Sequence, residues 1–547
     1  MRLTASHRLA AGIVVLGALL RIAGFAEQRP LWLDEAMVAL NVGRRSYLGL
    51  LEPLGYDQVA PAFYLWVVKT ATVLLGMNEL ALRLPALVAG LALPWIVWLL
   101  GRRLIGDVGG LIAALLVACS PVLVGYANEV KPYGLDAFAT ASLLLLAHRA
   151  MFIPNARNRV LLGAGGVLAV GFSLPSVFTL AAISLVLFGD AFAHRDRRLG
   201  VAALGWATLW LVVFTAQFLH VVGGAAADST MRGYWDGAMI DVGTPGWTAR
   251  VRMALGETLQ PFAALPYRLR TWLPLPLFAV SALILLRRGT WRTAALLVLP
   301  VAAALAASAV GVYPVIARLA LFLAPIGALA LAVPLSTAWD ASAHRRLPRL
   351  VVGMVIALLG VTSIRTASRP LARDEGGRTL IAELRQQRDD EPVYLLPSAV
   401  PLWVFETTDW AFPDTARLDR YARVATSGGS AFHNAESRGR PVQRVGGAAP
   451  WAEADGLVIV GQSTGMRYVY VRDYLTAVPD TGWGDAEVAR LRATGPSAWL
   501  FGAHAIPQES DALREAIARA GGRIVFEGTE PRAFLWRVLF DESLITP

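Results

Sequence analysis

Long apolar runs dominate the chain up to about residue 365. A helix needs about 20 predominantly apolar residues to cross a bilayer, and runs near that length recur throughout this part. The pattern predicts eleven membrane-spanning helices, at about 9–25, 80–101, 108–125, 132–148, 160–174, 176–192, 200–221, 272–286, 293–311, 317–335 and 350–364. The run at 61–76 is shorter and contains Lys69, so it can be a span or a helix lying in the membrane interface.

The hydrophobic pattern changes after about residue 366. Apolar runs are now only a few residues long and alternate with polar helical patterns such as 509–520, which is typical of buried strands between amphipathic helices. The predicted strands lie at 393–396, 457–460, 498–501, 524–526 and 534–539. We therefore expect two domains, a membrane domain over 1–365 and a small α/β domain over 366–547.

Composition supports a membrane protein. The 547 residues are 56% hydrophobic and only 16% charged, whereas a soluble protein carries about 25% charged residues. Too few polar side chains remain to cover a water-exposed surface, which excludes a fully soluble protein and a disordered chain. Cys119, the single cysteine, lies in an apolar run, which excludes a disulfide scaffold. The sequence thus predicts a polytopic α-helical membrane protein with a C-terminal α/β domain.

Arginines set the expected orientation. If 61–76 does not span, every short loop on one side of the membrane is basic, with Arg2, Arg8, Arg102, Arg103, Arg149, Arg157, Arg159, Arg195, Arg197, Arg198, Arg287, Arg288, Arg292, Arg345, Arg346 and Arg349. Positive charge collects in cytoplasmic loops, so we expect a cytoplasmic N-terminus in a bacterial plasma (inner) membrane, and an interfacial helix at 61–76 outside the cytoplasm. This placement also explains much of the net charge of +10 without a nucleic-acid partner. The first apolar run resembles a signal peptide, but with ten spans following we expect an uncleaved helix.

The first candidate motif is Arg-Pro-Leu-Trp-Leu-Asp-Glu-Ala at 29–36, in the first loop outside the cytoplasm. It places Asp34 and Glu35 just after the first helix leaves the membrane. Adjacent acids at a bilayer surface are costly to keep without a role. The structural alternative is capping, in which either acid opens a helix at 36–51 and accepts hydrogen bonds from free backbone N–H groups.

Three further segments on the same side carry polar and aromatic residues. They contribute Tyr56, Asp57, Gln58 and Tyr64 from 56–66, Glu129, Lys131 and Tyr133 from 126–133, and Tyr313 and Arg318 from 313–318. Each has a simpler explanation, because Tyr and Trp collect at membrane interfaces and an arginine at a helix entrance can reach lipid headgroups. Since all are predicted at one depth, we expect them to converge with the two acids. Acids beside cations suit a reaction in which Lys or Arg holds a lipid-borne phosphate while a carboxylate deprotonates a hydroxyl.

Taken in order, these motifs resemble a known family. The chain is similar to the GT-C glycosyltransferases in the order of five features. These are a long first outer loop with Trp-Leu-Asp-Glu, a Pro-aromatic-Tyr helix, Glu-Leu-Ala-Leu-Arg-Leu-Pro at 79–85, Arg-Arg-Leu-Ile-Gly at 102–106 and Tyr-Pro…Arg at 313–318. Within them, residues 1–335 are most similar to the family 39 group, which includes protein O-mannosyltransferases and lipid A aminoarabinose transferases.

The resemblance implies a GT-C fold and a transferase that moves a sugar from a polyprenyl-phosphate donor to a hydroxyl on the extracytoplasmic face, with inversion. The acceptor would be a glycolipid, a lipopolysaccharide or a protein. The family's catalytic carboxylate maps onto Asp34, with Glu35 the adjacent acid. Its phosphate-binding cations map onto Lys131 and Arg318, and we expect Tyr313 to assist them. The expected lining of the donor or acceptor pocket is Tyr56, Asp57, Gln58, Tyr64, Glu129 and Tyr133.

Several specifics stay open. Aminoarabinose transferases carry Glu-Lys before the proline of the second segment, whereas this chain has Gln58-Val59-Ala60-Pro61, which weakens that particular activity. The histidines form no zinc-binding pair, but Asp34 could contact a divalent cation as readily as a hydroxyl, so no cofactor is assigned. The alternative function is a transporter or flippase of lipid-linked sugars. Transporters place ionisable groups near the bilayer midplane, whereas here these groups lie at outer helix ends.

Overall fold

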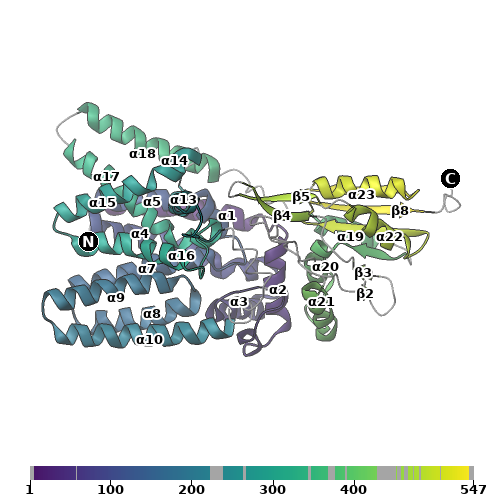
Figure 1. Ribbon diagram of the computed structural model, residues 1–547, viewed down its shortest axis with the longest axis horizontal. Helices are drawn as coiled ribbons and strands as arrows, with labels where there is room; N and C mark the ends of the chain where they lie inside the picture. Colours follow the sequence, from purple (N-terminus) through teal and green to yellow (C-terminus); the bar gives the residue numbers. More distant parts are fainter. Residues whose placement is uncertain are drawn as a thin grey trace.

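The computed structural model describes most of the chain. The described residues are 5–56, 58–221, 238–262, 267–342, 346–367, 376–387, 391–427, 451–452, 458–460, 466–471, 474–479, 482–505 and 507–540. A bundle of helices forms one part of the molecule and an α/β region built around a sheet forms the other, with two short helices between them (Figure 1).

The bundle contains long apolar helices that run side by side. They are α1 (Ala5–Ala26), α4 (Glu79–Ile105), α5 (Asp107–Ala118), α6 (Pro121–Tyr126), α7 (Tyr133–Phe152), α8 (Ala156–Phe172), α9 (Ser176–Ala193), α10 (Arg197–Val221), α15 (Pro274–Arg287), α16 (Trp291–Ala309), α17 (Ala324–Ala341) and α18 (Arg346–Ala367). Connections on the side of the site contain η1 (Gly49–Leu51), α13 (Trp247–Gly256), α14 (Tyr267–Trp272) and η2 (Ala317–Leu323). Each of the eleven predicted spans falls on one or two of these helices.

Within the described part of the chain, seven helical segments are long and apolar enough to cross a membrane. They are α1, α4, α7, α9, α10, α16 and the continuous segment formed by η2 and α17. The shorter apolar helices include α5, α15 and part of α18. These segments confirm the predicted polytopic helical fold.

Two short helices, α2 (Leu33–Arg44) and α3 (Ala62–Leu75), lie between the bundle and the α/β region (Figure 1). The 14 residues of α3 extend about 21 Å at 1.5 Å per residue, which is shorter than the roughly 30 Å hydrocarbon core of a bilayer. Lys69 of α3 donates a hydrogen bond to the Val42 carbonyl at the end of α2 (3.0 Å). The length of α3 favours the interfacial helix over a span.

The predicted span at 108–125 consists of two helices rather than one. Helix α5 ends at Ala118, and α6 begins at Pro121 with the Ser120 hydroxyl accepting the Leu123 N–H (3.1 Å). A proline at the first helical position starts a helix but cannot continue the one before it. The break leaves carbonyl groups at the end of α5, and the guanidinium of Arg21 on α1 donates to them: Nη1 to Ala118 (2.8 Å) and Nη2 to Val117 (3.1 Å).

The C-terminal α/β region contains a six-stranded sheet in the order β2-β3-β1-β6-β8-β7. Its strands are β1 (Val393–Leu395), β2 (Trp451–Ala452), β3 (Val458–Val460), β6 (Ser497–Ala503), β7 (Arg523–Glu530) and β8 (Ala533–Leu539), and β4 (Met466–Val471) pairs separately with β5 (Tyr474–Pro479). The central strand β1 pairs in parallel with β3 and β6, whereas β8 is antiparallel to both β6 and β7. All five predicted strands are present, and the predicted helix at 509–520 overlaps α23 (Pro507–Arg519).

The two faces of this sheet pack against different partners. Successive side chains of a strand point to opposite faces, so Tyr394 and Leu500 join a core with α22 (Trp483–Arg492) and α23. Leu395 and Phe501 join a second core with α19 (Arg378–Gln387) and α20 (Val400–Thr407). That second core continues without interruption into α2, α3 and α4. The α/β region therefore shares one of its two hydrophobic cores with the membrane part.

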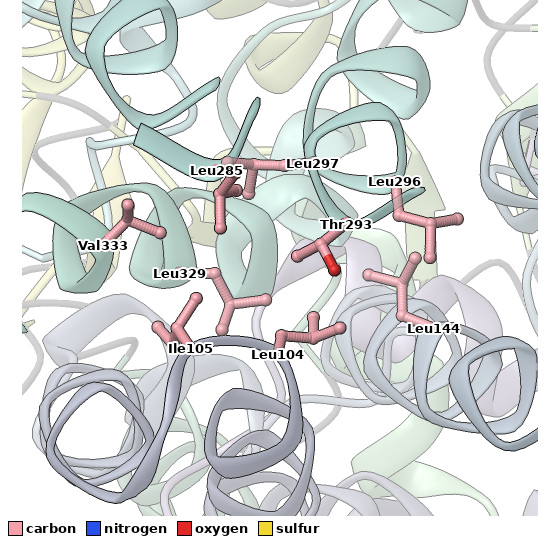
Figure 2. Close-up of a pocket in the computed structure, with 9 residues that line it drawn as sticks. All are labelled: Leu104, Ile105, Leu144, Leu285, Thr293, Leu296, Leu297, Leu329 and Val333. Atoms are coloured by element: carbon pink, nitrogen blue, oxygen red, sulfur yellow. The ribbon is translucent and has the colours of Figure 1, made fainter. Parts of the chain in front are cut away.

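A small apolar cavity lies among α4, α7, α15, α16 and α17 (Figure 2). Its lining residues are Leu104, Ile105, Leu144, Leu285, Thr293, Leu296, Leu297, Leu329 and Val333. The cavity lies at the C-terminal end of α4, about 30 Å along the helix from Arg83 near its start. Its apolar lining and its position set it apart from the charged groups described next.

Candidate active site

The first turn of α2 carries both candidate acids. The chain leaves α1, and α2 begins at Leu33. The Trp32 N–H donates a hydrogen bond to Glu35 Oε2 (3.3 Å). The capping interpretation therefore holds for Glu35, which satisfies a backbone N–H at the start of the helix.

Glu35 is fully buried, and both oxygens of its carboxylate accept hydrogen bonds. Arg83 of α4 contacts it with both arms of its guanidinium, Nε to Oε1 (2.9 Å) and Nη2 to Oε2 (2.8 Å). The Val130 N–H donates to Oε1 (2.8 Å), and Arg29 Nη1 lies 3.4 Å from Oε2. Burial alone would raise the pKa of Glu35, but the two guanidiniums and the Val130 amide outweigh it and lower the pKa below its usual range.

These contacts tie the carboxylate of Glu35 to its neighbours on every side, and a part in catalysis for this residue stays a prediction. Glu35 joins the loop before α2, the start of α4 and the loop between α6 and α7, because Arg83 also donates to the Arg29 carbonyl (2.7 Å). Arg83 is not among the site residues predicted from the sequence. The feature of the sequence that could have identified Arg83 is its place in the Glu-Leu-Ala-Leu-Arg-Leu-Pro stretch at 79–85.

Asp34 has a different environment on the adjacent side of the same turn. Its Oδ2 lies 2.8 Å from Arg318 Nη1 and 3.7 Å from Lys131 Nζ. The carboxylate keeps 18% of its surface exposed, whereas the Glu35 side chain has none. The structure thus brings together one acid and two cations from three separate segments, as the sequence analysis expected.

Lys131 lies in the loop between α6 and α7 and is 4% exposed. Its Nζ donates to Gln58 Oε1 (2.6 Å), so Gln58 orients the ammonium toward Asp34. Burial lowers the pKa of Lys131, and the Asp34 carboxylate partly opposes this shift. Lys131 thus contacts the Asp34 carboxylate and the neutral amide of Gln58, and a buried ammonium is stabilised by an anionic partner.

Arg318 lies at the start of η2, and its guanidinium is close to two aromatic rings. It lies 5.6 Å from the Trp32 ring and 5.7 Å from the Tyr133 ring, distances at which a cation is attracted to an aromatic face. Glu257, after α13, accepts the Ala317 N–H (3.0 Å) and so fixes the residue preceding Arg318. Glu257 is a second contributor that the sequence analysis missed, because its partner is a backbone group.

The remaining candidates lie around this cluster in different roles. The Tyr313 hydroxyl donates to the Leu319 carbonyl (2.8 Å), which shapes the η2 turn. Tyr64 is fully buried in α3 and Tyr56 is 3% exposed, and burial raises the pKa of both phenols. Glu129 is also buried, at 4% exposed. Asp57 lies outside the described residues.

The geometry defines what the site can do chemically. A partly exposed carboxylate can accept a proton, and two adjacent cations can stabilise negative charge on a phosphate group. Within the described residues, no group of three or more His, Cys, Asp or Glu side chains is arranged to hold a metal ion. The partly exposed carboxylate and its two neighbouring cations are suited to proton transfer beside an anion.

The chain is similar to a protein family and to several solved structures. Residues 59–221 match the family model of dolichyl-phosphate-mannose-protein mannosyltransferase. No curated protein matches the chain. The structure is similar to that of ArnT from Cupriavidus metallidurans bound to undecaprenyl phosphate, with 13% identity, a TM-score of 0.52 and 100% of both chains covered.

Two other solved structures are also similar. The apo state of ArnT from Cupriavidus metallidurans has 15% identity and a TM-score of 0.48, and the match covers 98% of this chain and 99% of that one. The oligosaccharyltransferase of Archaeoglobus fulgidus in complex with Zn and sulfate has 14% identity and a TM-score of 0.47, over 72% of this chain and 61% of that one. The fold is the GT-C fold, which defines a class of membrane glycosyltransferases. The predicted resemblance to that class is confirmed.

Proposed function

We propose that this protein transfers a sugar from a polyprenyl-phosphate donor to a hydroxyl acceptor on the extracytoplasmic face, with inversion at the anomeric carbon. The observation that carries the proposal is the Asp34 carboxylate with Lys131 Nζ at 3.7 Å and Arg318 Nη1 at 2.8 Å. The match to a mannosyltransferase family model and the fold shared with ArnT, whose structure holds undecaprenyl phosphate, support it.

The proposed chemistry needs few groups, because a sugar phosphate already carries a leaving group. Donor phosphate oxygens replace Asp34 as the partners of Lys131 and Arg318, which leaves the carboxylate available as a base. The acceptor oxygen attacks the anomeric carbon while its proton moves to Asp34, and the bond from that carbon to the phosphate oxygen breaks. The two cations stabilise the charge on the departing polyprenyl phosphate.

Other residues are proposed to support these three. Gln58 orients Lys131, while Tyr133 and Trp32 flank Arg318. Tyr313 shapes the η2 turn through its bond to Leu319. The remaining proposed pocket residues are Tyr56, Asp57, Tyr64 and Glu129. We propose Asp34 alone as the base, since Glu35 has no exposed surface.

The proposal includes an orientation. Arginine-rich ends of the bundle helices face the cytoplasm of a bacterium and the cluster around Asp34 faces the other side of the inner membrane. We also propose a division into a membrane domain over 1–365 and a second domain over 366–547, which lies outside the cytoplasm. The proposed acceptor is a lipid or a protein.

The test uses membranes that contain the full-length protein and a panel of radiolabelled polyprenyl-phosphate sugars. We expect label from one donor to appear in a lipid or protein fraction, and to be absent when membranes lack the protein. Label that crosses sealed vesicles without being joined to any acceptor would replace this proposal with the flippase alternative.

A further inference from the structure

The C-terminal α/β region packs directly on α2, the helix that carries Asp34. Helix α20 and the neighbouring α21 (Thr415–Ser427) both contact α2. One hydrophobic core runs from Val38 and Val42 of α2 through Leu402 of α20 to Leu395 in the sheet. Interfaces that allow domains to move are smaller and more polar, so this shared core fixes α2 relative to the α/β region. The same arrangement is visible in Figure 1, where α20 and α21 lie beside α2.

At this interface an indole ring packs over a glycine. Gly43 lies in the last turn of α2, where glycine weakens a helix relative to alanine. A Cβ at this position would lie 2.3 Å from Cζ3 and 2.8 Å from Cη2 of Trp410. The ring is held there, because Trp410 Nε1 donates to the Phe405 carbonyl (3.0 Å) and the two rings pack 5.6 Å apart. The missing side chain of Gly43 makes room for Trp410.

Ion pairs from the same region reach α2, which carries both acids, and α4, which carries Arg83. Asp419 of α21 pairs with Arg44 Nη1 at the end of α2 (2.6 Å). Arg378 of α19 pairs with Glu79 at the start of α4, one helical turn before Arg83. Each of these two pairs has one exposed partner, and such pairs contribute little to stability. Their expected effect is to orient α2 and α4 relative to the α/β region.

We infer that the C-terminal region is a positioning element for Asp34, and that Trp410 is the positioning residue through which it fixes α2. The inference rests on the proposed function. Asp34 lies nine residues before Gly43 on the same helix, about 13 Å along its axis. A short helix moves as a rigid body, so a displacement at Gly43 moves Asp34. Lys131 and Arg318 stand on other elements, so such a displacement changes the distances from their charged groups to Asp34.

The test is Gly43→Ala in the full-length protein, measured by steady-state glycosyl transfer with a polyprenyl-phosphate sugar. The methyl group displaces Trp410 and shifts α2, and misplacing a reacting group by about 1 Å can cost about 100-fold in rate. We expect kcat to fall at least about 10-fold, because the base is misplaced, while the KM for the donor changes less than about 2-fold. Adding Trp410→Leu to Gly43→Ala removes the clash but keeps an apolar side chain against α2, and is expected to restore part of kcat, to about the level of Trp410→Leu alone.

The matched control is Gly12→Ala in α1, because a Cβ at that helical glycine meets nothing within 4 Å. This control is expected to keep wild-type kcat and KM. If Gly43→Ala fails to fold, Trp410→Phe provides a second test without a clash, with a smaller fall in kcat and an unchanged donor KM expected.

A wild-type kcat in Gly43→Ala would overturn the inference, and so would a loss that Trp410→Leu does not restore. A rise in donor KM at constant kcat would also overturn it, since that pattern indicates a role in donor binding. These failures are distinct from that of the proposed function, in which the wild-type protein itself transfers no sugar from any donor.

Discussion

Asp34 and Glu35 are neighbours in one helical turn, yet their surroundings are opposite. Adjacent residues of a helix point about 100° apart, so Glu35 faces the bundle and Asp34 faces the cations of the site. Glu35 has two guanidiniums and two backbone N–H groups as partners and no exposed surface. Asp34 is partly exposed beside Lys131 and Arg318. The pair of adjacent acids thus contains one fully buried acid and one partly exposed acid, and the proposed function assigns the role of base to the exposed one.

The strongest test of this difference is Asp34→Asn. The amide keeps the shape of the side chain but cannot accept the hydroxyl proton, so we expect kcat to fall about 100- to 10,000-fold. The midpoint of thermal unfolding in detergent should stay close to that of wild type, because Asp34 is partly exposed and Lys131 keeps its hydrogen bond to Gln58. Asp107→Asn, at an exposed acid paired with Arg102 at the far end of α4, is the matched control for loss of one carboxylate. Near wild-type transfer by Asp34→Asn would remove Asp34 from the reaction.

Glu35→Gln tests the other acid. The substitution leaves Arg83 and Arg29 buried without a countercharge, and breaking a buried pair in this way costs about 3–5 kcal/mol. We expect a clear fall in the midpoint of thermal unfolding, measured on the purified protein beside Asp34→Asn. The two variants should therefore separate, one losing rate and the other losing stability. An unfolding midpoint equal to that of wild type would show that the guanidiniums find other partners.

Lys131→Arg tests the cationic side of the comparison through pH. Because the pKa of Lys131 is lowered by burial, the ammonium loses its proton at a lower pH than an exposed lysine does. As pH rises past that point the donor phosphate loses an attractive charge, so the KM for the donor should increase on the alkaline side. Arginine stays protonated there, and the alkaline limb of the pH profile of kcat/KM should move to higher pH in the variant. An unchanged limb would assign the titration to another group.

Lys69→Met is expected to have the smallest effect. Lys69 donates to the Val42 carbonyl at the C-terminal end of α2, and a cation at a helix C-terminus contributes about 0.3–1 kcal/mol. We expect a small fall in the unfolding midpoint and a nearly unchanged donor KM. A large loss of kcat with wild-type stability would instead place Lys69 in the reaction, on the same side of the comparison as Asp34.

Much of the membrane fold could be predicted because its signal is local. Each of the eleven long apolar runs falls on one or two helices, and short apolar runs identified five of the six strands of the sheet, with β2 missed. The break between α5 and α6 was missed, although Ser120 and Pro121 are a known start signal for a helix. Apolar length was given more weight than that signal.

The site could be predicted only in part. Asp34, Lys131 and Arg318 were selected because the topology places their segments on one side of the membrane. The Arg83 partner of Glu35 lies 48 residues away in sequence, and no spacing rule connects them. The same holds for Trp410 over Gly43, which depends on how the α/β region docks. Local patterns identified the elements and the charged groups, whereas the pairing between distant segments required the structure.

The guanidinium of Arg21 ties the first helix to the break between α5 and α6. The carbonyls of Val117 and Ala118 are the negative end of the α5 dipole, and inside a bilayer no water can replace a missing donor. Removing α1 as a cleaved leader would leave these groups without the partner they have in the folded protein, directly before the segment that leads to Lys131. Through this one buried charge, the first helix contributes to the geometry of the segment that leads to the site.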